Sequence, residues 1–178
     1  NRVRKVDTTG IITTIAGNGF GVDSMSGGYS GDGGPADSAS MHSPFGLAID
    51  KTGNILIADM NNNCIRKVTP AGIISTIAGN DTIPGYNGDN IPASTARLSV
   101  PSGLAVDTAG NIYIADGGND RIRKISVYGL ITTFAGTGYP GFSGDGGDCT
   151  DAEFLSPGSV SLDNNGNMYI SDAANYRI

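Results

Sequence analysis

The chain has 178 residues, of which 28 are glycine and 8 are proline, so about one residue in five breaks regular structure. Apolar residues make up 38%, which is enough for a core, and no stretch approaches the ~20 consecutive apolar residues of a membrane span. The formal net charge of −6 at pH 7 argues against a nucleic-acid-binding surface spread over the whole molecule.

A repeat organises the sequence. The string GNILIAD at residues 53–59 returns as GNIYIAD at 110–116 and as GNMYISD at 166–172. Val3 aligns with Ile65, Ile122 and Ile178, at steps of 62, 57 and 56 residues. Self-similarity at such a period is typical of proteins built from one repeated supersecondary unit.

Each repeat predicts four short strands, rich in Ile, Val, Leu, Tyr and Thr and separated by turn residues. Residues 1–16 supply the third and fourth strands of one unit, and residues 45–78 and 102–135 each supply a complete unit. Residues 158–178 supply the first two strands of a last unit. The fold class is therefore all-β, with antiparallel four-stranded units.

The apolar pattern predicts how these units pack. Both faces of residues 55–58 are apolar, so this second strand is expected to be buried on both sides. Residues 65–68 alternate apolar and basic side chains, which predicts a solvated outer row that pairs with the abundant Asp. Units whose first strands are buried and whose outer strands are more exposed to solvent are typical of β-propeller blades. The same rows count against a nucleic-acid partner, because they are not interleaved with aromatics.

A long glycine-rich connector leads from each fourth strand to the next first strand. A helical turn is expected in it, with Ala39 and Met41, or their equivalents, as the apolar members. Asp32, Asp89 and Asp145 hold equivalent places and are the candidate metal ligands, for Ca²⁺, which takes several oxygen ligands. The favoured alternative is structural: each Asp accepts backbone N–H bonds and fixes its own loop, with no cofactor.

Other candidate sites give no catalytic residue. Asp59, Asp116 and Asp172 end the second strands, where they either form a polar circle on one face or, as we favour, make turn hydrogen bonds. The G-x-G-x-x-G match at 136–141 lacks the helix that a dinucleotide site needs. His42 is the single histidine and is unmatched in the other repeats, so no Ser-His-acid arrangement is expected. We also expect no disulfide between Cys64 and Cys149.

The recurring strings resemble the NHL-repeat β-propeller family. This resemblance covers nearly the whole chain and implies a ring, often of six blades, of which the chain would form about three. Such a ring would be completed by further blades of a longer chain or by a second copy.

The resemblance implies a non-enzymatic scaffold that binds a protein or glycan partner. The alternative is part of a propeller enzyme, a metal-dependent lyase or hydrolase with its site in the central cavity. The sequon Asn80-Asp81-Thr82, with Asn80 as the candidate glycosylation site, and the scarcity of lysine favour an extracellular location.

Overall fold

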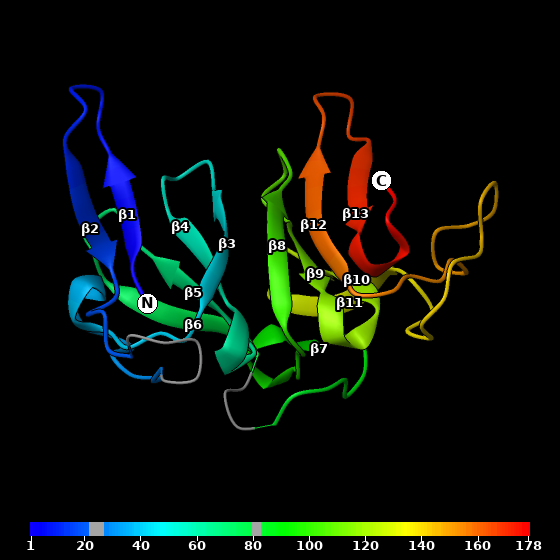
Figure 1. The fold of residues 1–178 in the computed structure, drawn as a ribbon, viewed down its shortest axis with the longest axis horizontal. Coiled ribbons are helices and arrows are strands. Elements are labelled where there is room, and N and C mark those ends of the chain that lie inside the picture. Colours follow the sequence, from blue (N-terminus) through cyan, green and yellow to red (C-terminus); the bar gives the residue numbers. More distant parts are fainter. Residues whose placement is uncertain (22–26, 80–82) are drawn as a thin grey trace.

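The computed structural model describes residues 1–21, 27–79 and 83–178, and its strands form four antiparallel sheets (Figure 1). The two middle sheets are larger, and a two-stranded sheet lies at either end. The first two sheets contain β1 (Val3–Val6) and β2 (Ile12–Ala16), then β3 (Pro44–Ile49), β4 (Ile55–Asp59), β5 (Cys64–Val68) and β6 (Ile74–Gly79). The expected antiparallel four-stranded unit is confirmed.

The second half of the chain repeats this order with one addition. Its strands are β7 (Ile91–Pro92), β8 (Pro101–Val106), β9 (Ile112–Asp116), β10 (Arg121–Ile125), β11 (Leu130–Ala135), β12 (Pro157–Leu162) and β13 (Met168–Asp172). The short strand β7, which the sequence does not predict, pairs with the outer edge of β11 and makes that sheet five-stranded.

Turn chemistry follows the sequence closely. Asp50 accepts backbone N–H bonds from Thr52 (2.9 Å) and Asn54 (3.0 Å), which closes the turn between β3 and β4. Gly53 in that turn has φ +81°, a conformation that favours glycine. Asp163 accepts the same two bonds between β12 and β13.

The helical turns lie close to their expected places in two of the three connectors. Short 3-10 helices span Ala36–Ser38 and Ala93–Thr95, just before the buried Ala39 and Ala96. The expectation is wrong for the third connector, since residues 137–156 are all described and contain no helix. None of the helices in the described parts of the chain has the length and hydropathy to span a bilayer.

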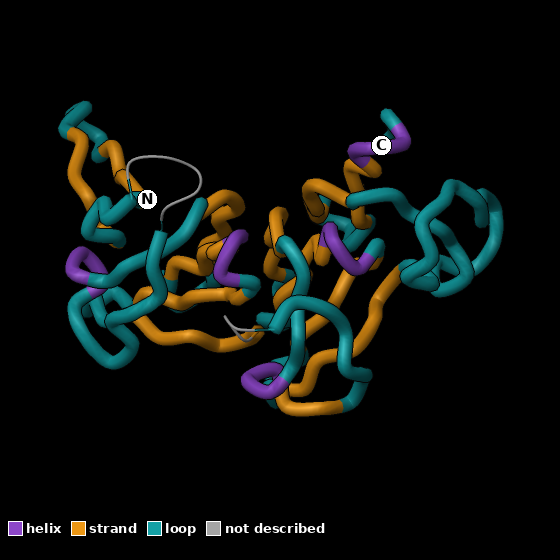
Figure 2. The backbone as a smooth tube through the Cα atoms, turned by 60° about the horizontal axis from the view of Figure 1, so that its bottom comes forward, coloured by secondary structure: helices purple, strands orange, loops and turns teal. Residues whose placement is uncertain are grey.

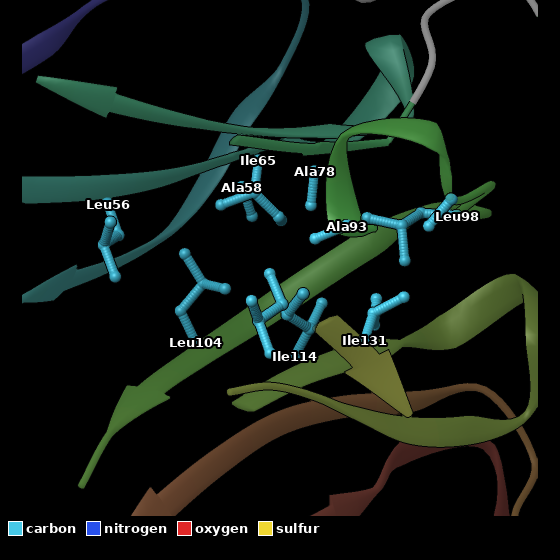
Figure 3. Packing of buried hydrophobic residues seen from close by; sticks show 11 residues of the cluster. Leu56, Ala58, Ile65, Ala78, Ala93, Leu98, Leu104, Ile114 and Ile131 are labelled. Atoms are coloured by element: carbon cyan, nitrogen blue, oxygen red, sulfur yellow. The ribbon is translucent and has the colours of Figure 1, made fainter. Parts of the chain in front are cut away.

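The core lies between neighbouring sheets. Leu56 and Ala58 of β4 face Leu104 of β8 and Ile114 of β9 across the two middle sheets (Figure 3). Leu56, Ile57 and Ala58 are all fully buried, so β4 is dry on both faces, as predicted.

The prediction that the first strand is buried and the third strand is exposed to solvent is wrong for the β3–β6 sheet. Phe45, Leu47 and Ile49 of β3 are exposed, whereas β5 is buried apart from the half-buried Lys67. Connector residues cover β5, and within the described residues no neighbouring sheet covers the outer face of β3.

The first strands of adjacent sheets approach closely, and glycine makes this approach possible. A Cβ atom added to Gly46 of β3 would clash with the Ser102 carbonyl of β8, and one added to Gly103 would clash with Ser159 of β12. Neither glycine has a positive φ, so the constraint is space and not backbone conformation.

We expect Gly103→Ala to lower the free energy of unfolding by about 1–3 kcal/mol, because the added methyl group overpacks the contact between β8 and β12. Gly147→Ala, in an exposed connector, is the matched control and should change stability by less than about 0.5 kcal/mol. Denaturant unfolding measures both, and equal effects would show that the close approach of the strands is unimportant.

Candidate functional site

A buried arginine lies between two aspartates in each of the two middle sheets. In the first, Arg66 Nη2 lies 2.8 Å from Asp32 Oδ1, and Arg66 Nη1 lies 3.3 Å from Asp59 Oδ2. The Arg66 side chain is 0% exposed. A charge removed from water in this way is costly unless opposite charges and hydrogen bonds surround it.

The same cluster recurs in the second middle sheet. Arg123 Nη2 lies 3.0 Å from Asp89 Oδ1, and Arg123 Nη1 lies 3.8 Å from Asp116 Oδ2. Both arginines follow their connector aspartate by 34 residues. We name the two sets the Arg66 cluster (Asp32, Asp59, Arg66) and the Arg123 cluster (Asp89, Asp116, Arg123).

The connector aspartates fasten the connector to the next sheet. The backbone N–H of Thr76 in β6 donates to Asp32 Oδ2 (3.0 Å), and that of Thr133 in β11 donates to Asp89 Oδ1 (2.8 Å). Each donor lies 44 residues beyond its aspartate. The sequence-based expectation that each carboxylate only fixes its own loop is therefore wrong, because each one binds a neighbouring strand. Arg66 Nη2 also donates to the Ser30 carbonyl (3.0 Å) in the connector.

The aspartates at the ends of the second strands, Asp59 and Asp116, link the last residues of the preceding connector to the sheet. Asp59 accepts the backbone N–H of His42 (2.7 Å), and Asn62 Nδ2 donates both to Asp59 Oδ2 (2.9 Å) and to the Gly28 carbonyl (2.9 Å). Asp116 with Asn119 repeats this pattern. Turn-type hydrogen bonds are therefore present, and the buried Asp59 and Asp116 form no solvent-facing polar circle.

Aromatic rings of the connectors complete the arrangement. The Arg66 guanidinium lies 4.8 Å from the ring centre of Tyr29, and that of Arg123 lies 4.9 Å from Tyr86. Arg177 stacks on Phe142 at 3.8 Å. The negative face of an aromatic ring attracts a cation, most strongly where water is excluded.

The expectation of a solvated basic row is wrong for Arg66 and Arg123, which are fully buried. The alternation of apolar and polar residues along a strand indicates which residues point to the same face. It does not indicate what covers that face. The signal that sequence reasoning missed is the constant spacing of 34 residues between Asp and Arg in two repeats.

Burial sets the charge state of the strand-end aspartates. Desolvation raises the pKa of Asp116 to about 6, although bonds from Asn119 and Ser99 and the charge of Arg123 favour its ionised form. Desolvation also raises the pKa of Asp59. Burial acts in the same direction on Asp32, but the hydrogen bonds from Thr76 and the charge of Arg66 outweigh it, so the pKa of Asp32 lies below its usual value.

Asp145, the third candidate metal ligand, lines a hollow together with Arg177, whose guanidinium stacks on Phe142. It is exposed and forms no ion pair within the described residues, while Asn175 Nδ2 donates to Asp172 Oδ2 (2.6 Å) and to the Gly141 carbonyl (2.6 Å) nearby. In the described parts of the chain no three His, Cys, Asp or Glu side chains are grouped as metal ligands. At Asp32 and Asp89 the neighbouring positive group is a guanidinium.

Two further predictions concern Asn80 and the two cysteines. Asn80, the candidate glycosylation site, lies outside the described residues. Cys64 is buried at the start of β5 and Cys149 is exposed in the third connector, so the two form no disulfide with each other, as predicted.

Stacked four-stranded antiparallel sheets with this repeat and these connectors are the blades of an NHL-type β-propeller. The family model described as the Teneurin NHL domain matches residues 15–85 and 84–141. The chain therefore belongs to the teneurin NHL-domain family.

Individual relatives cover different parts of the chain. Human teneurin-4 is 39% identical over 99 residues, which is 49% of this chain and 4% of that protein. Human teneurin-1 is 26% identical over 194 residues, and teneurin-m of Drosophila melanogaster is 28% identical over 193. Each of these two matches covers 99% of this chain and 7% of the relative, so the chain spans a small part of the relatives it matches.

Solved structures show the same fold. A Bacteroides thetaiotaomicron protein of unknown function superimposes with a TM-score of 0.74 at 23% identity, covering 96% of this chain and 39% of that one. A streptogramin B lyase superimposes with a TM-score of 0.55 at 18% identity, covering 98% of this chain and 42% of that one. At these identities the likeness concerns the fold alone.

The raised pKa of Asp116 predicts a pH-dependent stability. The folded state binds a proton at Asp116 more tightly than the unfolded state, so this contribution to stability is present below pH 4 and is lost as pH rises through about 6. The unfolding free energy of the wild type, relative to that of Asp116→Asn, should fall by up to about 1.4 kcal/mol per pH unit in this window.

Urea unfolding between pH 4 and 7.5 measures this difference. Asp107→Asn is the matched control, because hydrogen bonds from Asn111 outweigh burial and hold the pKa of Asp107 below its usual value. Its stability difference from the wild type should stay constant above pH 5. A constant difference for Asp116→Asn as well would contradict the role of burial at Asp116.

Proposed function

We propose that this chain is part of an extracellular NHL-type β-propeller that acts as a non-enzymatic scaffold and binds a protein partner through its connectors. The observations that carry the proposal are that buried ion pairs hold the first two connectors, and that Phe20 in the first connector and Tyr139 in the third are exposed. Membership of the teneurin NHL-domain family supports the same conclusion.

The first two connectors are anchored to the sheets by arginine side chains. Arg66 bonds to the Ser30 carbonyl and to Asp32, and Arg123 bonds to the Gly88 carbonyl and to Asp89. A loop that is already ordered loses less conformational entropy when it binds, so such connectors suit recognition.

The connectors also expose aromatic side chains. Phe20 and Tyr139 follow the fourth strand at equivalent places in two repeats and are 61% and 73% exposed. Figure 2 brings forward the side of the molecule on which the connectors, drawn as loops, gather. Aromatic side chains contribute most of the binding energy in many protein interfaces, because they bury a large area at low entropic cost.

The six-bladed ring belongs to this proposal. The chain contributes two larger sheets and two two-stranded sheets, which together amount to about three blades. It covers 39% and 42% of the two solved structures described above, so each of those chains extends well beyond the part that matches. The scarcity of lysine and the sequon at Asn80 support an extracellular setting.

We expect a biotinylated chain, tetramerised on streptavidin, to bind at least one member of a panel of purified extracellular receptor domains. The double variant Phe20→Ala/Tyr139→Ala should weaken that binding at least about tenfold, since it removes two exposed aromatic contacts. Biolayer interferometry measures the affinities.

Tyr128→Ala is the matched control, because Tyr128 is 88% exposed in the turn before β11 and lies outside the connectors. It should bind as the wild type does. Loss of binding in Tyr128→Ala with full binding in the double variant would contradict the connector surface, and a panel without any binder would contradict the scaffold.

A further inference from the structure

A hollow of about 610 Å³ lies between the two middle sheets, at the end where tight turns join the strands (Figure 1). The turn between β3 and β4 lines one side, and the turns from β8 to β9 and from β10 to β11 line the other. Backbone hydrogen bonds from Asp50 to Asn54 (3.0 Å) and from Ser126 to Leu130 (2.8 Å) close two of these turns. The strand pairing places the start of β3 and the end of β6, where connectors join the sheet, at the opposite end.

The next repeat fills the equivalent place with two aromatic rings. Tyr113 and Phe134 correspond in sequence to Leu56 and Ile77, and their ring centres lie 5.0 Å apart in an edge-to-face arrangement. Leu56 lies at one end of the core between the middle sheets (Figure 3), and with the half-buried Ile77 it lines the hollow. The smaller pair therefore leaves room where the next repeat holds aromatic rings.

The polar groups that surround Tyr113 recur around the hollow. The Tyr113 hydroxyl donates to Asp107 Oδ2 (3.2 Å), and the ammonium group of Lys124 lies 5.5 Å from the centre of the Tyr113 ring. Asp50 and Lys67 hold the places of Asp107 and Lys124, and both line the hollow. The hollow therefore has the acceptor and the cation that accompany a tyrosine in the next repeat, without the tyrosine.

The acceptor of the hollow has room for a further donor. Asp107 Oδ2 accepts hydrogen bonds from Asn111 Nδ2 (2.7 Å) and from the Tyr113 hydroxyl. Asp50 Oδ2 accepts the equivalent bond from Asn54 Nδ2 (2.7 Å), and no second donor reaches it from the described residues. A carboxylate oxygen can accept two hydrogen bonds, so a phenol hydroxyl fits beside Asn54.

The unpaired charges of the hollow are positive. Lys51 and Lys67 line it and are two of the four lysines in a chain whose net charge is −6. Neither forms an ion pair within the parts of the chain that the structure describes. The Asp50 carboxylate already accepts bonds from Thr52 and Asn54 in its own turn. Complementary charge fixes the choice of partner, so the lysines favour an acidic one.

We propose that this hollow is a docking site, separate from the connector surface, for a segment of a protein partner that carries a tyrosine among acidic residues. The tyrosine ring packs on Leu56 and Ile77, and its hydroxyl donates to Asp50. The acidic neighbours of the tyrosine pair with Lys51 and Lys67. Because hydrogen bonds already order the surrounding turns, little conformational entropy is lost when the segment binds.

Titration of residues 1–178 with the capped peptide Glu-Glu-Tyr-Glu-Glu, followed by heteronuclear NMR, tests the proposal. We expect a dissociation constant below about 1 mM, with shift changes confined to residues 50–56, 67, 77, 109–112 and 125–129. Replacing the tyrosine of the peptide by phenylalanine should weaken binding at least about fivefold, because the bond to Asp50 is lost. Equal affinity for a peptide with alanine at that place, shift changes confined to the connectors, or no binding at 1 mM would overturn the proposal.

Charge reversal at the hollow supplies a second test. Lys67→Glu should weaken binding of the tyrosine peptide at least about tenfold, because it sets a carboxylate against the acidic segment. Lys5→Glu is the matched control, since Lys5 holds the equivalent place in the exposed strand β1 and the net charge changes equally. It should alter the affinity less than about twofold. Equal losses in both variants would show that only the net charge matters and would overturn the site.

A variant that fills the hollow supplies the third test. Leu56→Tyr/Ile77→Phe introduces the pair of the next repeat and should abolish peptide binding, with circular dichroism as the check that it folds. Peptide binding by the folded double variant would overturn the proposal, and Lys67→Glu decides the matter if it does not fold. Phe20→Ala/Tyr139→Ala should bind the peptide as the wild type does, so failure of the connector surface and failure of this site are distinguishable.

Discussion

The rest of the structure depends on how two buried arginine side chains are accommodated. Arg66 and Arg123 are 0% exposed, and a buried guanidinium is tolerated only when opposite charge and hydrogen-bond acceptors surround it. Two carboxylates, a connector carbonyl and an aromatic ring surround the guanidinium in each cluster, while Nε of both arginines and Nη1 of Arg123 form no hydrogen bond within the described residues. Because these groups come from the connector and from the sheet, satisfying the arginine also fixes the connector in place.

This constraint links the fold to its proposed role. Long glycine-rich loops lose much conformational entropy when they become ordered, and few apolar contacts offset that loss. Here the ion pairs and the backbone bonds to Thr76 and Thr133 hold the loops against the outer strands. The exposed Phe20 belongs to the first of these loops, so it is presented by a surface that needs little further ordering when a partner binds.

The features that could be predicted are those that a few neighbouring residues determine. The Asp50 turn, the positive φ of Gly53 and the doubly buried β4 all follow from local composition and spacing. The burial of Arg66 could not be predicted in this way, because the groups that bury it lie about 34 residues earlier in the chain. Likewise, the exposure of β3 depends on which sheet lies beside it, and the sequence of β3 alone carries no information on that.

A double-mutant cycle between Asp89→Asn and Arg123→Met tests most directly whether the ion pair joins connector and sheet. We expect a coupling energy of at least about 1.5 kcal/mol in the free energy of unfolding, because the two groups are buried in one network. A parallel cycle between Asp89→Asn and Lys124→Met, which involves the half-buried neighbour of Arg123, should give effects that add within about 0.5 kcal/mol. Additive effects for Asp89 and Arg123 as well would show that this ion pair does not join the connector to the sheet.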